Sequence, residues 1–568
     1  MPENAQIPTT EQIFEMMIKK GAQVFANLEA LSLDAVNISE KLLLDIVQGS
    51  ADTEYGKKYG FETIKSIKDY KEKVPFSIYD DYAEYIERMN RKGERGLITN
   101  NPIVHYAVTS GSIGNPKLIP VSARTVELYS MYATSLYYAV SENYYQKNFG
   151  RPVHRGHGLC SLEIIMKHAA DGLTVGCISA AATDTLKQIA PILMTNPIPI
   201  LFPPTPVEQR YLRLRFGLPC RDVALLGGSF MTSFSDLFMY LEANWEMLCD
   251  DIEQGSINSS LKLPEELREQ LVPYLKADPE RAQELRAIFK GGFDKVLRRI
   301  WPNLDFISAI GTAGFKVYTD KMRRYAGDIP IHHQAYAASE ALFAIATELE
   351  KEEYVLIPDG GFYEFIPVDS VNENETLTMD QLEAGKMYEI VVTNLSGFYR
   401  YRIGDVIKVT GFHNKTPTLA FVYRKKQMVS IAGEKTDESM ITWTIEKLIK
   451  ETGIDVFDYS IYPNMETSPG SYTFLIESPH SVPQDKIQEY RRIIEKKISE
   501  ANPSVGAKIQ SGVLSPCELY FLQPQTYYLY RDLQIMRGYS ENQLKPIRVI
   551  DTPEKRNFFF ALFDKESL

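Results

Sequence analysis

The chain has 568 residues, of which 44% are hydrophobic and 24% are charged, and its 62 basic and 74 acidic side chains give a net charge of −12. A chain of this length exceeds one ordinary hydrophobic core, so we expect two or more domains. The acidic balance argues against nucleic acid as a partner, because a negative surface repels the phosphate backbone.

The beginning of the chain shows no targeting signal. The stretch "MPENAQIPTTEQ" has neither a basic region nor an apolar region of the kind found in signal peptides. No apolar run approaches the roughly 18 residues of a membrane span. Five cysteines without CxxC spacing read as reduced thiols. We therefore expect a cytoplasmic protein that has no membrane association and no obligate protein partner.

The first predicted element is helical. In residues 11–48, the apolar side chains recur with helical spacing and fall largely on one side, which predicts a helix packed on the core. They are Ile13, Met16, Met17, Val24, Phe25 and Leu28. A second amphipathic segment at 80–94 precedes a predicted strand at Ile103–Val108. We expect this strand to run directly into a glycine-rich loop, with a helix beginning near Ala123.

The rest of the chain predicts an α/β protein. Apolar runs such as "LTVGCISAA", "IPILFPP" and "DVALLGGS" alternate with helical stretches up to about residue 380, which favours a substantial sheet. Residues 383–423 are strand-rich, and a new α+β pattern follows, with helices at Met440–Thr452 and Gln484–Ala501. We place the domain boundary near 424, giving a large N-terminal domain (1–423) and a small α+β C-terminal domain (424–568).

The loop after the first predicted strand reads "TSGSIGNPK", from Thr109 to Lys117. Its glycines allow backbone N–H groups to approach phosphate oxygens, and its hydroxyl groups can donate to them. The spacing is not that of a Walker loop, because Lys117 is followed by Leu118, and the GxGxxG dinucleotide motif is absent. Taken alone, the loop is either a phosphate-binding loop or an ordinary surface turn.

Three further motifs favour phosphate binding. The loop resembles the [ST]-[ST]-G-[ST]-T-G-x-P-K signature of the adenylate-forming superfamily, with Ile113 where that pattern has threonine. "IGTAG" at Ile310–Gly314 resembles the turn that borders adenine, and "YAASE" at Tyr336–Glu340 resembles an acidic motif that helps to bind Mg²⁺. "YRIGD" at Tyr401–Asp405 resembles the motif whose carboxylate binds the ribose hydroxyls. The order of these motifs is that of the superfamily.

Longer stretches narrow the resemblance to one family. "IWPNLDFI", "GFYEFIP", "GFYRYRIGDVIKV", "SIAGEKTDE" and "QLKPIR" resemble the auxin-responsive acyl acid amido synthetase (Gretchen Hagen) family, and we expect a bacterial-type member. The resemblance runs from about residue 40 to 550. It implies a large N-terminal adenylate-forming domain, a small mobile C-terminal domain, ATP with Mg²⁺, and a carboxylic acid and an amine or amino acid as substrates.

The resemblance also implies roles for individual residues. Lys545, in the C-terminal domain, and Glu340 would be catalytic, and Glu340 would also bind the metal. The residues assigned to nucleotide binding are Thr109, Ser110, Gly111, Ser112, Gly114, Gly311, Thr312, Tyr336, Ser339, Glu340, Asp405 and Arg424. Rotation about Arg424–Gln427 would withdraw Lys545 between the two half-reactions.

Two other functions remain open from the sequence. One is an acyl-CoA synthetase or another adenylate-forming acyltransferring ligase. The other is a catalytically weak ATP-binding or assembly protein on the same fold. Non-functional roles also stay open for single residues. Glu340 could be a carboxylate at the start of a helix, and Lys545 could be an ordinary surface lysine. The segment "FYEFIP" could be a core strand that does not line the substrate site.

Overall fold

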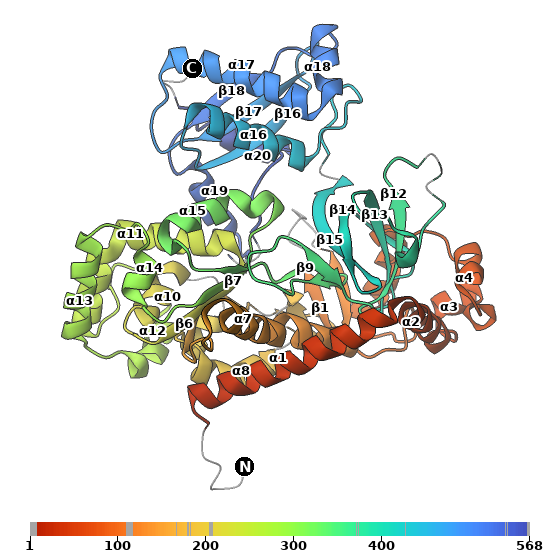
Figure 1. Ribbon diagram of the computed structural model, residues 1–568, viewed down its shortest axis with the longest axis horizontal. Coiled ribbons are helices and arrows are strands. Elements are labelled where there is room, and N and C mark those ends of the chain that lie inside the picture. The colour runs from red at the N-terminus through yellow and green to blue at the C-terminus, as the bar shows by residue number, and fades with distance from the viewer. Residues whose placement is uncertain are drawn as a thin grey trace.

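The computed structural model describes residues 8–108, 117–165, 167–178, 181, 183–203, 208–370, 372, 374–425, 428–539, 541 and 544–564. A large unit carries the elements from α1 to β15, and a smaller unit, α16 to α20, sits on top of it (Figure 1). The predicted fold class, a large N-terminal α/β unit with a smaller C-terminal one, is therefore confirmed.

The helices of the large unit surround its sheets, with α10 to α14 at the left, α1 and α8 along the lower side and α2 to α4 at the right in Figure 1. They are α1 Thr10–Leu33, α2 Ala35–Gly49, α3 Glu54–Tyr59, α4 Ile67–Lys73, α5 Ala83–Lys92, α6 Ala123–Leu128, α7 Thr134–Phe149, α8 Thr183–Leu193, α9 Ile198–Leu201, α10 Gln209–Gly217, α11 Met231–Gln254, α12 Glu265–Leu271, α13 Pro279–Lys290, α14 Val296–Ile300 and α15 Lys316–Ala326. Short 3-10 turns are η1 Phe61–Thr63, η2 Tyr79–Asp81, η5 Val272–Tyr274, η6 Ala313–Phe315 and η7 Met379–Gln381, and η3 Tyr129–Ala133 is a π-helix.

The predicted N-terminal helix is present as α1. Thr9 caps it, since its side chain accepts from the Gln12 backbone while the Gln12 side chain accepts from the Thr9 backbone. Most of the predicted apolar face is buried against α7 and its surroundings. The exception is Met16, predicted on this face, which is 49% exposed because, at 3.6 residues per turn, it falls to the side of the buried stripe that contains Ile13 and Met17.

Three sheets build the large unit. Their strands are β1 Ile103–Val108, β2 Leu118–Ser122, β3 His157–Cys160, β4 Lys167–His168, β5 Thr174–Gly176, β6 Val223–Phe230, β7 Phe306–Ile310, β8 Ile331–His332, β9 Ala335–Ala337, β10 Leu342–Ile345, β11 Tyr354–Leu356, β12 Phe362–Pro367, β13 Met387–Thr393, β14 Tyr401–His413 and β15 Thr416–Arg424. The order β3-β6-β7-β8 is parallel, β2-β1-β5-β4 is mixed, and β12-β13-β14-β15-β11-β10-β9 is antiparallel. The predicted strand-rich texture of 383–423 is confirmed by β13, β14 and β15.

The strand at Ile103–Val108 and the helix beginning at Ala123 are confirmed as β1 and α6. Between them the structure adds β2, which the sequence analysis missed, and Val108 pairs with Leu118 at the loop end of the resulting hairpin. The glycine-rich loop therefore joins two paired strands and not a strand and a helix. The segment "IPILFPP" also differs from a sheet strand, because its first half forms the short helix α9.

The smaller unit has its own core. Its sheet has the order β16-β17-β18, and its hydrophobic cluster contains buried residues such as Ile445, Phe474 and Ile494. The elements are α16 Glu438–Thr452, β16 Asp458–Asn464, β17 Ser471–Glu477, α17 Gln484–Ala501, α18 Pro503–Gln510, β18 Glu518–Leu522, α19 Thr526–Met536 and α20 Pro553–Phe560. The predicted helix Gln484–Ala501 matches α17, and β15 ends at Arg424, but the exact domain boundary stays a prediction.

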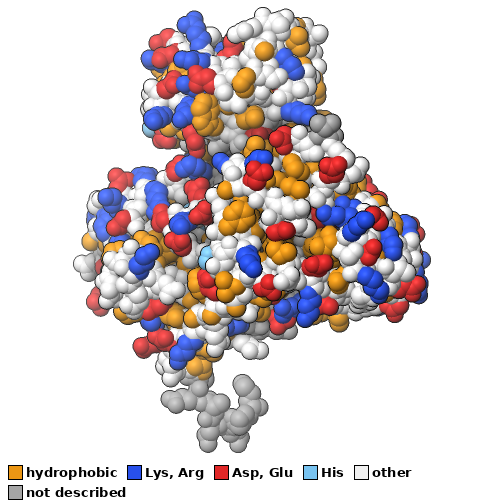
Figure 2. Space-filling model, turned by 45° about the vertical axis from the view of Figure 1, so that its right-hand side comes forward, with side chains coloured by type: hydrophobic (Ala, Val, Ile, Leu, Met, Phe, Trp, Pro, Cys, Tyr) orange, Lys and Arg blue, Asp and Glu red, His pale blue; other side chains and the backbone are white. Residues whose placement is uncertain are grey.

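Among the described residues, no helix is both long enough and apolar enough to span a bilayer. All five cysteines carry free thiols. Acidic and basic side chains are interspersed over the face shown in Figure 2.

Buried charges join the two units where α19 lies next to α11 and α15 (Figure 1). Arg531 on α19 donates to Asp236 on α11 at 2.8 Å. Asp458, the first residue of β16, accepts from Tyr318 on α15 and pairs with Arg548 at 2.6 Å. All four charged side chains are nearly inaccessible to solvent. The Arg531–Asp236 ion pair and the Tyr318–Asp458 hydrogen bond therefore cross between the units, whereas Asp458 and Arg548 both belong to the smaller unit.

Candidate active site

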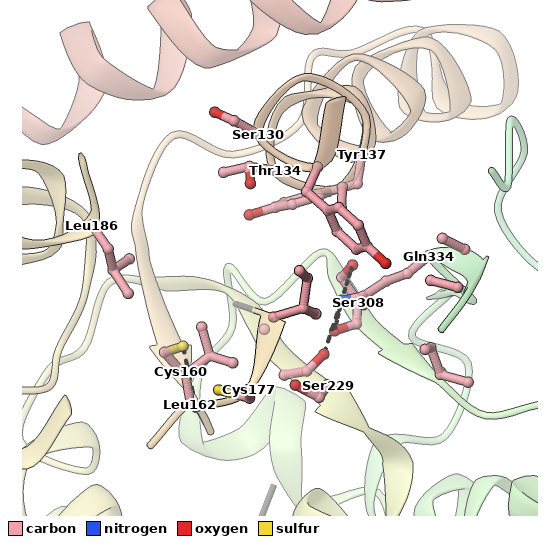
Figure 3. A pocket seen from close by; sticks show the side chains of 18 of the residues that line it. Ser130, Thr134, Tyr137, Cys160, Leu162, Cys177, Leu186, Ser229, Ser308 and Gln334 are labelled. Atoms are coloured by element: carbon pink, nitrogen blue, oxygen red, sulfur yellow. Dashed lines mark hydrogen bonds between the residues drawn. The ribbon is translucent and has the colours of Figure 1, made fainter. Parts of the chain in front are cut away.

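A cavity of about 370 Å³ lies in the large unit, between the helix pair η3–α7 and the parallel sheet (Figure 3). It is lined by Met17, Val108, Val126, Tyr129, Ser130, Ala133, Thr134, Tyr137, Tyr138, Gly158, Leu159, Cys160, Leu162, Cys177, Ile178, Leu186, Ile189, Leu193, Met194, Leu225, Gly227, Gly228, Ser229, Phe230, Ser308, Ile310, Gln334, Ala335, Ala337, Ala338, Ser339, Leu342 and Lys545. Most of these side chains are apolar. Lys545 is the only charged one among them, and it comes from the smaller unit.

A small polar group interrupts the apolar wall. Gln334 donates to the carbonyl oxygens of Gly228 and Ser308, at 2.9 and 3.0 Å, and to the Ser308 hydroxyl at 3.2 Å. Figure 3 shows the Tyr137 hydroxyl directed toward Gln334 and Ser308. The Gln334 amide is thereby fixed across the ends of two parallel strands, β6 and β7, where ligands of α/β folds commonly bind. The cavity thus offers an apolar body with a few oriented polar atoms.

The π-helix η3 shapes one wall of this cavity. Its Tyr129 hydroxyl donates to the Ala338 carbonyl at 2.6 Å, and Tyr129, Ser130 and Ala133 all line the space. A π-turn inside a helix is rare and often marks a functional site, since it leaves side chains in positions that a regular helix cannot reach. Here it ties the helix wall to the "YAASE" segment.

The predicted ribose carboxylate has partners already. Asp405, on β14, is 1% exposed. It accepts from Arg424 Nε and Nη2 at 2.5 and 3.0 Å and from the Tyr336 hydroxyl at 2.9 Å. Burial opposes the charge on Arg424, but the charge and hydrogen bonds of Asp405, together with the charge of Glu340, raise the guanidinium pKa. The structure therefore brings Tyr336, Asp405 and Arg424 together in one bonded group.

Glu340 lies beside that group, in the turn between β9 and β10. Its position in a turn excludes the helix-start alternative. Its carboxylate accepts from the Tyr401 hydroxyl at 3.4 Å, and its carbonyl accepts from the Asn394 amide at 2.7 Å. Burial raises the pKa of Glu340, although the charge of Arg424 works against this. Within the described part of the chain, no three or more His, Cys, Asp or Glu side chains gather as a metal site.

The predicted adenine turn is tightly built. The Gly311 carbonyl accepts from the Thr319 hydroxyl at 2.7 Å, and a Cβ on Gly311 would stand 2.3 Å from that hydroxyl. Thr312 is buried and its hydroxyl shares a hydrogen bond of 2.9 Å with Tyr354. Ala313 has a φ of +52°, which L-residues rarely adopt. These contacts fix the backbone of the turn. The Thr312 hydroxyl is already hydrogen-bonded to the Tyr354 hydroxyl in this structure.

Lys545 connects the cavity with the charged group. Its side chain is exposed, but the space it faces is the cavity. Loss of water to the surrounding protein lowers the pKa of Lys545, and the positive charge of Arg424 adds to this, against the pull of Asp405, Glu438 and Glu340. The surface-lysine alternative does not describe this placement.

The other predicted residues divide into two groups. Ser339 lines the cavity. Thr109, Ser110, Gly111, Ser112 and Gly114 lie outside the described residues. The loop that contains them begins after Val108, which lines the cavity. The strand "FYEFIP" is buried as β12 and contributes nothing to the cavity wall, in agreement with the plain-core alternative.

Sequence reasoning missed Tyr129, Tyr137, Ser308 and Gln334. The available signal is weak: Gln334 extends the short polar cluster that His332 and His333 form in "IHHQAYAAS". Tyrosines in a helix give no such signal, because half-buried tyrosine is common in cores. Finding these residues requires the π-turn and the sheet order, neither of which the sequence spells out.

Fold and site together define a two-unit α/β protein with a strand-edge cavity that a lysine from the smaller unit enters. Comparison with known proteins makes this specific. Models of the GH3 family N-terminal, central and C-terminal domains match residues 24–331, 354–424 and 439–554. The chain belongs to the GH3 family.

Curated relatives agree over nearly their whole length. Indole-3-acetic acid-amido synthetase GH3.8 of Oryza sativa subsp. indica is 28% identical over 555 residues, which cover 93% of this chain and 90% of the relative. Jasmonoyl-L-amino acid synthetase GH3.5 of Oryza sativa subsp. japonica is 26% identical over 570 residues, 94% of this chain and 96% of the relative. These relatives are plant proteins and lend no support to the expectation of a bacterial-type member.

A solved structure has the same fold. The GH3.15 acyl acid amido synthetase superposes with a TM-score of 0.84 at 25% identity, covering 95% of this chain and 96% of that one. The relatives are amido synthetases in every case described here, so this chain is an enzyme, a ligase of the acyl acid amido synthetase class.

Proposed function

We propose that this ligase adenylates an apolar monocarboxylic acid with ATP, releases pyrophosphate, and transfers the acyl group to the amine of an amino acid with release of AMP. The observation that carries the proposal is Lys545. It is the one charged side chain among the described residues that line this mainly apolar cavity. The charges of Glu340, Asp405 and Arg424 are close enough to act on its pKa. A carboxylate bound with its tail in the cavity meets its counter-charge at Lys545.

Activation is needed because a carboxylate is a poor electrophile: its negative charge repels nucleophiles. Attack of a carboxylate oxygen on the α-phosphorus of ATP forms the acyl–O–P bond and breaks the bond to pyrophosphate. AMP then leaves when the amine attacks the acyl carbon. The protein has to align the two reactants and stabilise charge that builds up on their oxygens.

Lys545 supplies that stabilisation in this proposal. In the free enzyme the surrounding protein, which displaces water, and the charge of Arg424 lower the pKa of Lys545, so nearby acidic groups do not fully balance its positive charge. The charge gains most when negative oxygens of the acid and the α-phosphate converge on it. Binding that strengthens as charge develops accelerates the reaction rather than merely tightening the ground state.

Asp405 would hold the ribose. A carboxylate has about four acceptor positions, and Arg424 and Tyr336 use three of them here. One ribose hydroxyl can be accepted without rearrangement, whereas accepting both requires Arg424 to release one of its two hydrogen bonds. The Gly311–Thr312 turn would border the base, and Ser339 the α-phosphate.

Mg²⁺ fits the residues that are present. It typically takes one or two carboxylates and completes its octahedron with phosphate and water oxygens. Glu340 offers one carboxylate whose pKa burial raises, so a nearby cation would restore its ionised form. When bound, the metal would offset phosphate charge. The loop residues Ser110, Gly111, Ser112 and Gly114 would hold the terminal phosphates.

Hydrophobic size selection is the expected basis of acid specificity. The curated relatives act, by their names, on indole-3-acetic acid and on jasmonoyl groups, both apolar bodies with one carboxyl group. Among the described residues that line the cavity, Lys545 is the only cation that a second carboxylate could meet. A cytoplasmic location and the absence of an obligate protein partner remain expectations.

The test is a panel of carboxylic acids read out by pyrophosphate release, with ATP and Mg²⁺. Aromatic and branched aliphatic monocarboxylic acids should give release, and their dicarboxylic counterparts should not. Adding single amino acids should then yield amide and AMP in equal amounts. Thioester formation from coenzyme A, with no amide from any amino acid, would instead support an acyl-CoA synthetase, and no release with any acid would leave only an ATP-binding protein.

A further inference from the structure

Helix α10 carries an unusual load of buried charge. Every residue of its sequence "QRYLRLRFG" is buried, including Arg210 and Arg213. Arg213 is fully inaccessible. Residues three apart on a helix lie on the same face, so the guanidinium groups of Arg210 and Arg213 lie side by side. Burying two like charges is costly unless a counter-charge meets them.

The counter-charge comes from the smaller unit. Glu541 accepts from Arg210 Nε through one carboxylate oxygen at 2.7 Å and from Arg213 Nη1 through the other at 2.8 Å. Arg210 also pairs with Asp532 at 2.9 Å and stacks on Tyr528, with 4.0 Å from its guanidinium carbon to the ring centroid. One carboxylate thus bridges both arginines.

Glu541 uses only part of the hydrogen-bonding capacity of Arg213. Among the described residues, its Nε and Nη2 have no hydrogen-bond partner although the side chain is fully buried. An unpaired buried donor costs free energy, and such a group in a folded protein calls for a functional reason. Arg213 can therefore bind more of a carboxylate than Glu541 takes.

The two arginines stand next to the acyl cavity. Burial raises the pKa of the cavity-lining Cys160 thiol to about 11, and the charge of Arg213 is near enough to act against that rise. The Glu541 backbone N–H also donates to the Glu163 carboxylate at 3.3 Å, and Glu163 follows the cavity-lining Leu162 in sequence. A small molecule bound at the arginines would adjoin the cavity wall.

Glu541 is four residues from Lys545 in the same segment. We propose that Arg210 and Arg213 bind the α-carboxylate of the acceptor amino acid, and that Glu541 occupies this site until the smaller unit withdraws Lys545. The proposal rests on the proposed function, which supplies the amino acid and the domain movement. The Glu541 carboxylate stands in for the substrate carboxylate in the conformation seen here.

The arrangement orders the reaction. While Lys545 is in the cavity for adenylation, Glu541 blocks the acceptor site. When the segment leaves, both arginines are free, and planar guanidinium groups bind a carboxylate in two-point fashion. Because the amine of an α-amino acid is two bonds from its carboxyl carbon, fixing the carboxylate also confines the nucleophile.

The test bypasses adenylation by supplying synthetic acyl-adenylate. Each variant receives either an amino acid or the corresponding amino acid amide, in which a neutral carboxamide replaces the carboxylate. The variants are Arg213→Gln and Arg210→Gln, with Glu541→Gln as the matched control that removes the bridging charge from the other side. The readout is the ratio of kcat/KM for amino acid to that for amino acid amide.

We expect each arginine variant to lose roughly 10- to 100-fold in kcat/KM for the amino acid, the usual effect of a charge-assisted pair. The amino acid amide should react as with the wild-type protein, which also shows that the variant is folded. The basicity difference between the two amines is the same for every variant and cancels. Glu541→Gln removes the carboxylate that competes for the arginines, so its ratio should be at least as high as that of the wild-type protein.

Arginine variants that retain the wild-type ratio would overturn the proposal, as would an equal loss of the ratio in Glu541→Gln. If Arg213→Gln does not fold, Arg210→Gln and Arg213→Lys test the proposal instead. Lysine keeps the positive charge, so Arg213→Lys should keep part of the preference for amino acid over amino acid amide. Absence of any amide from the wild-type protein, with either amine, would instead be a failure of the proposed function and would remove this site with it.

Discussion

The acyl cavity and the contact between the two units are adjacent, but their side chains differ in type: the first is mainly apolar and the second contains buried charges. The cavity wall is mainly apolar, with Gln334 and Ser308 as a fixed polar spot. The contact between units contains buried ion pairs, with Asp236–Arg531 at 2.8 Å and Arg210–Glu541 at 2.7 Å. The cavity is suited to an apolar ligand, whereas the buried charges bind one unit of the protein to the other.

The difference bears on movement. Apolar surface that leaves a core costs about 25 cal/mol for each Å² exposed. Ions that separate regain their hydration, so a buried ion pair adds little net stability over the open state. A contact rich in paired charges can therefore close with a defined geometry and still open. The paired charges of this contact are compatible with the proposed withdrawal of Lys545.

The largest expected effect comes from removing the group that belongs to both regions. Lys545→Ala should slow pyrophosphate formation by roughly 10²- to 10³-fold, the usual loss for one preorganised donor. Given synthetic acyl-adenylate and an amino acid, the same variant should form amide at nearly the wild-type rate. Equal losses in the two assays would make the lysine structural, and no loss in either would remove it from the site.

Asp405→Ala should raise the KM for ATP by roughly 10- to 100-fold, because each charge-assisted hydrogen bond to the ribose contributes about 1.5–3 kcal/mol. The KM for the carboxylic acid should change little, since Asp405 does not line the cavity. Asp405→Asn is the matched variant: it keeps the shape and leaves Arg424 without its charge partner. An unchanged ATP affinity in both variants would exclude Asp405 from ribose binding.

A single methyl group can probe the apolar region by itself. Gly227 lines the cavity, and a Cβ there would meet only Leu225 Cδ1, at 3.3 Å. Gly227→Ala should raise the KM for the bulkiest accepted acid by roughly 10-fold, the discrimination expected for one methylene group. The smallest accepted acid and ATP should be unaffected, so equal effects on large and small acids would contradict a size-selecting cavity.

The ionic region can be probed through Lys321 on α15. Its ammonium group lies 3.5 Å from the Phe457 ring centroid across the contact, and burial lowers its pKa from 10.5 to about 8. The unfolded protein then binds more protons between these two values, so this group makes stability rise as pH increases from about 8 to about 10.5.

Lys321→Met should therefore raise Tm near pH 7 and flatten that part of the stability profile. The gain is bounded by roughly 3 kcal/mol, the free-energy equivalent of the pKa shift. The measurement is thermal unfolding of both proteins over pH 7–10.5, taken as a difference so that other titrating groups cancel. Parallel profiles for the two proteins would show that Lys321 is not desolvated by the contact.

The sequence predicted the regular elements well where a pattern had one reading. The strand at Ile103–Val108 and the helix at Gln484–Ala501 are found with those bounds. It missed β2, because "LIPVS" is short and contains a proline that weakens its strand signal. It placed Met16 on the buried face because its apolar side chain was grouped with Ile13 and Met17, although it lies to the side of the stripe that these residues form.

The site was predictable only in part. Motifs located Tyr336, Asp405 and Arg424, which the structure joins by hydrogen bonds. The motifs could not show that these bonds already use most of the Asp405 carboxylate. The cavity and the Arg210–Arg213 pair have no local signature, since both arise when distant segments meet.

The most direct test of the central claim follows one oxygen atom. A carboxylic acid labelled with ¹⁸O in its carboxyl group is converted to amide with ATP and an amino acid, and the phosphorus products are analysed by mass spectrometry. If the acid is activated as an acyl-adenylate, its attacking oxygen leaves with AMP, so each AMP carries one ¹⁸O and pyrophosphate carries none. Label in inorganic phosphate, or AMP without label while amide accumulates, would contradict the account.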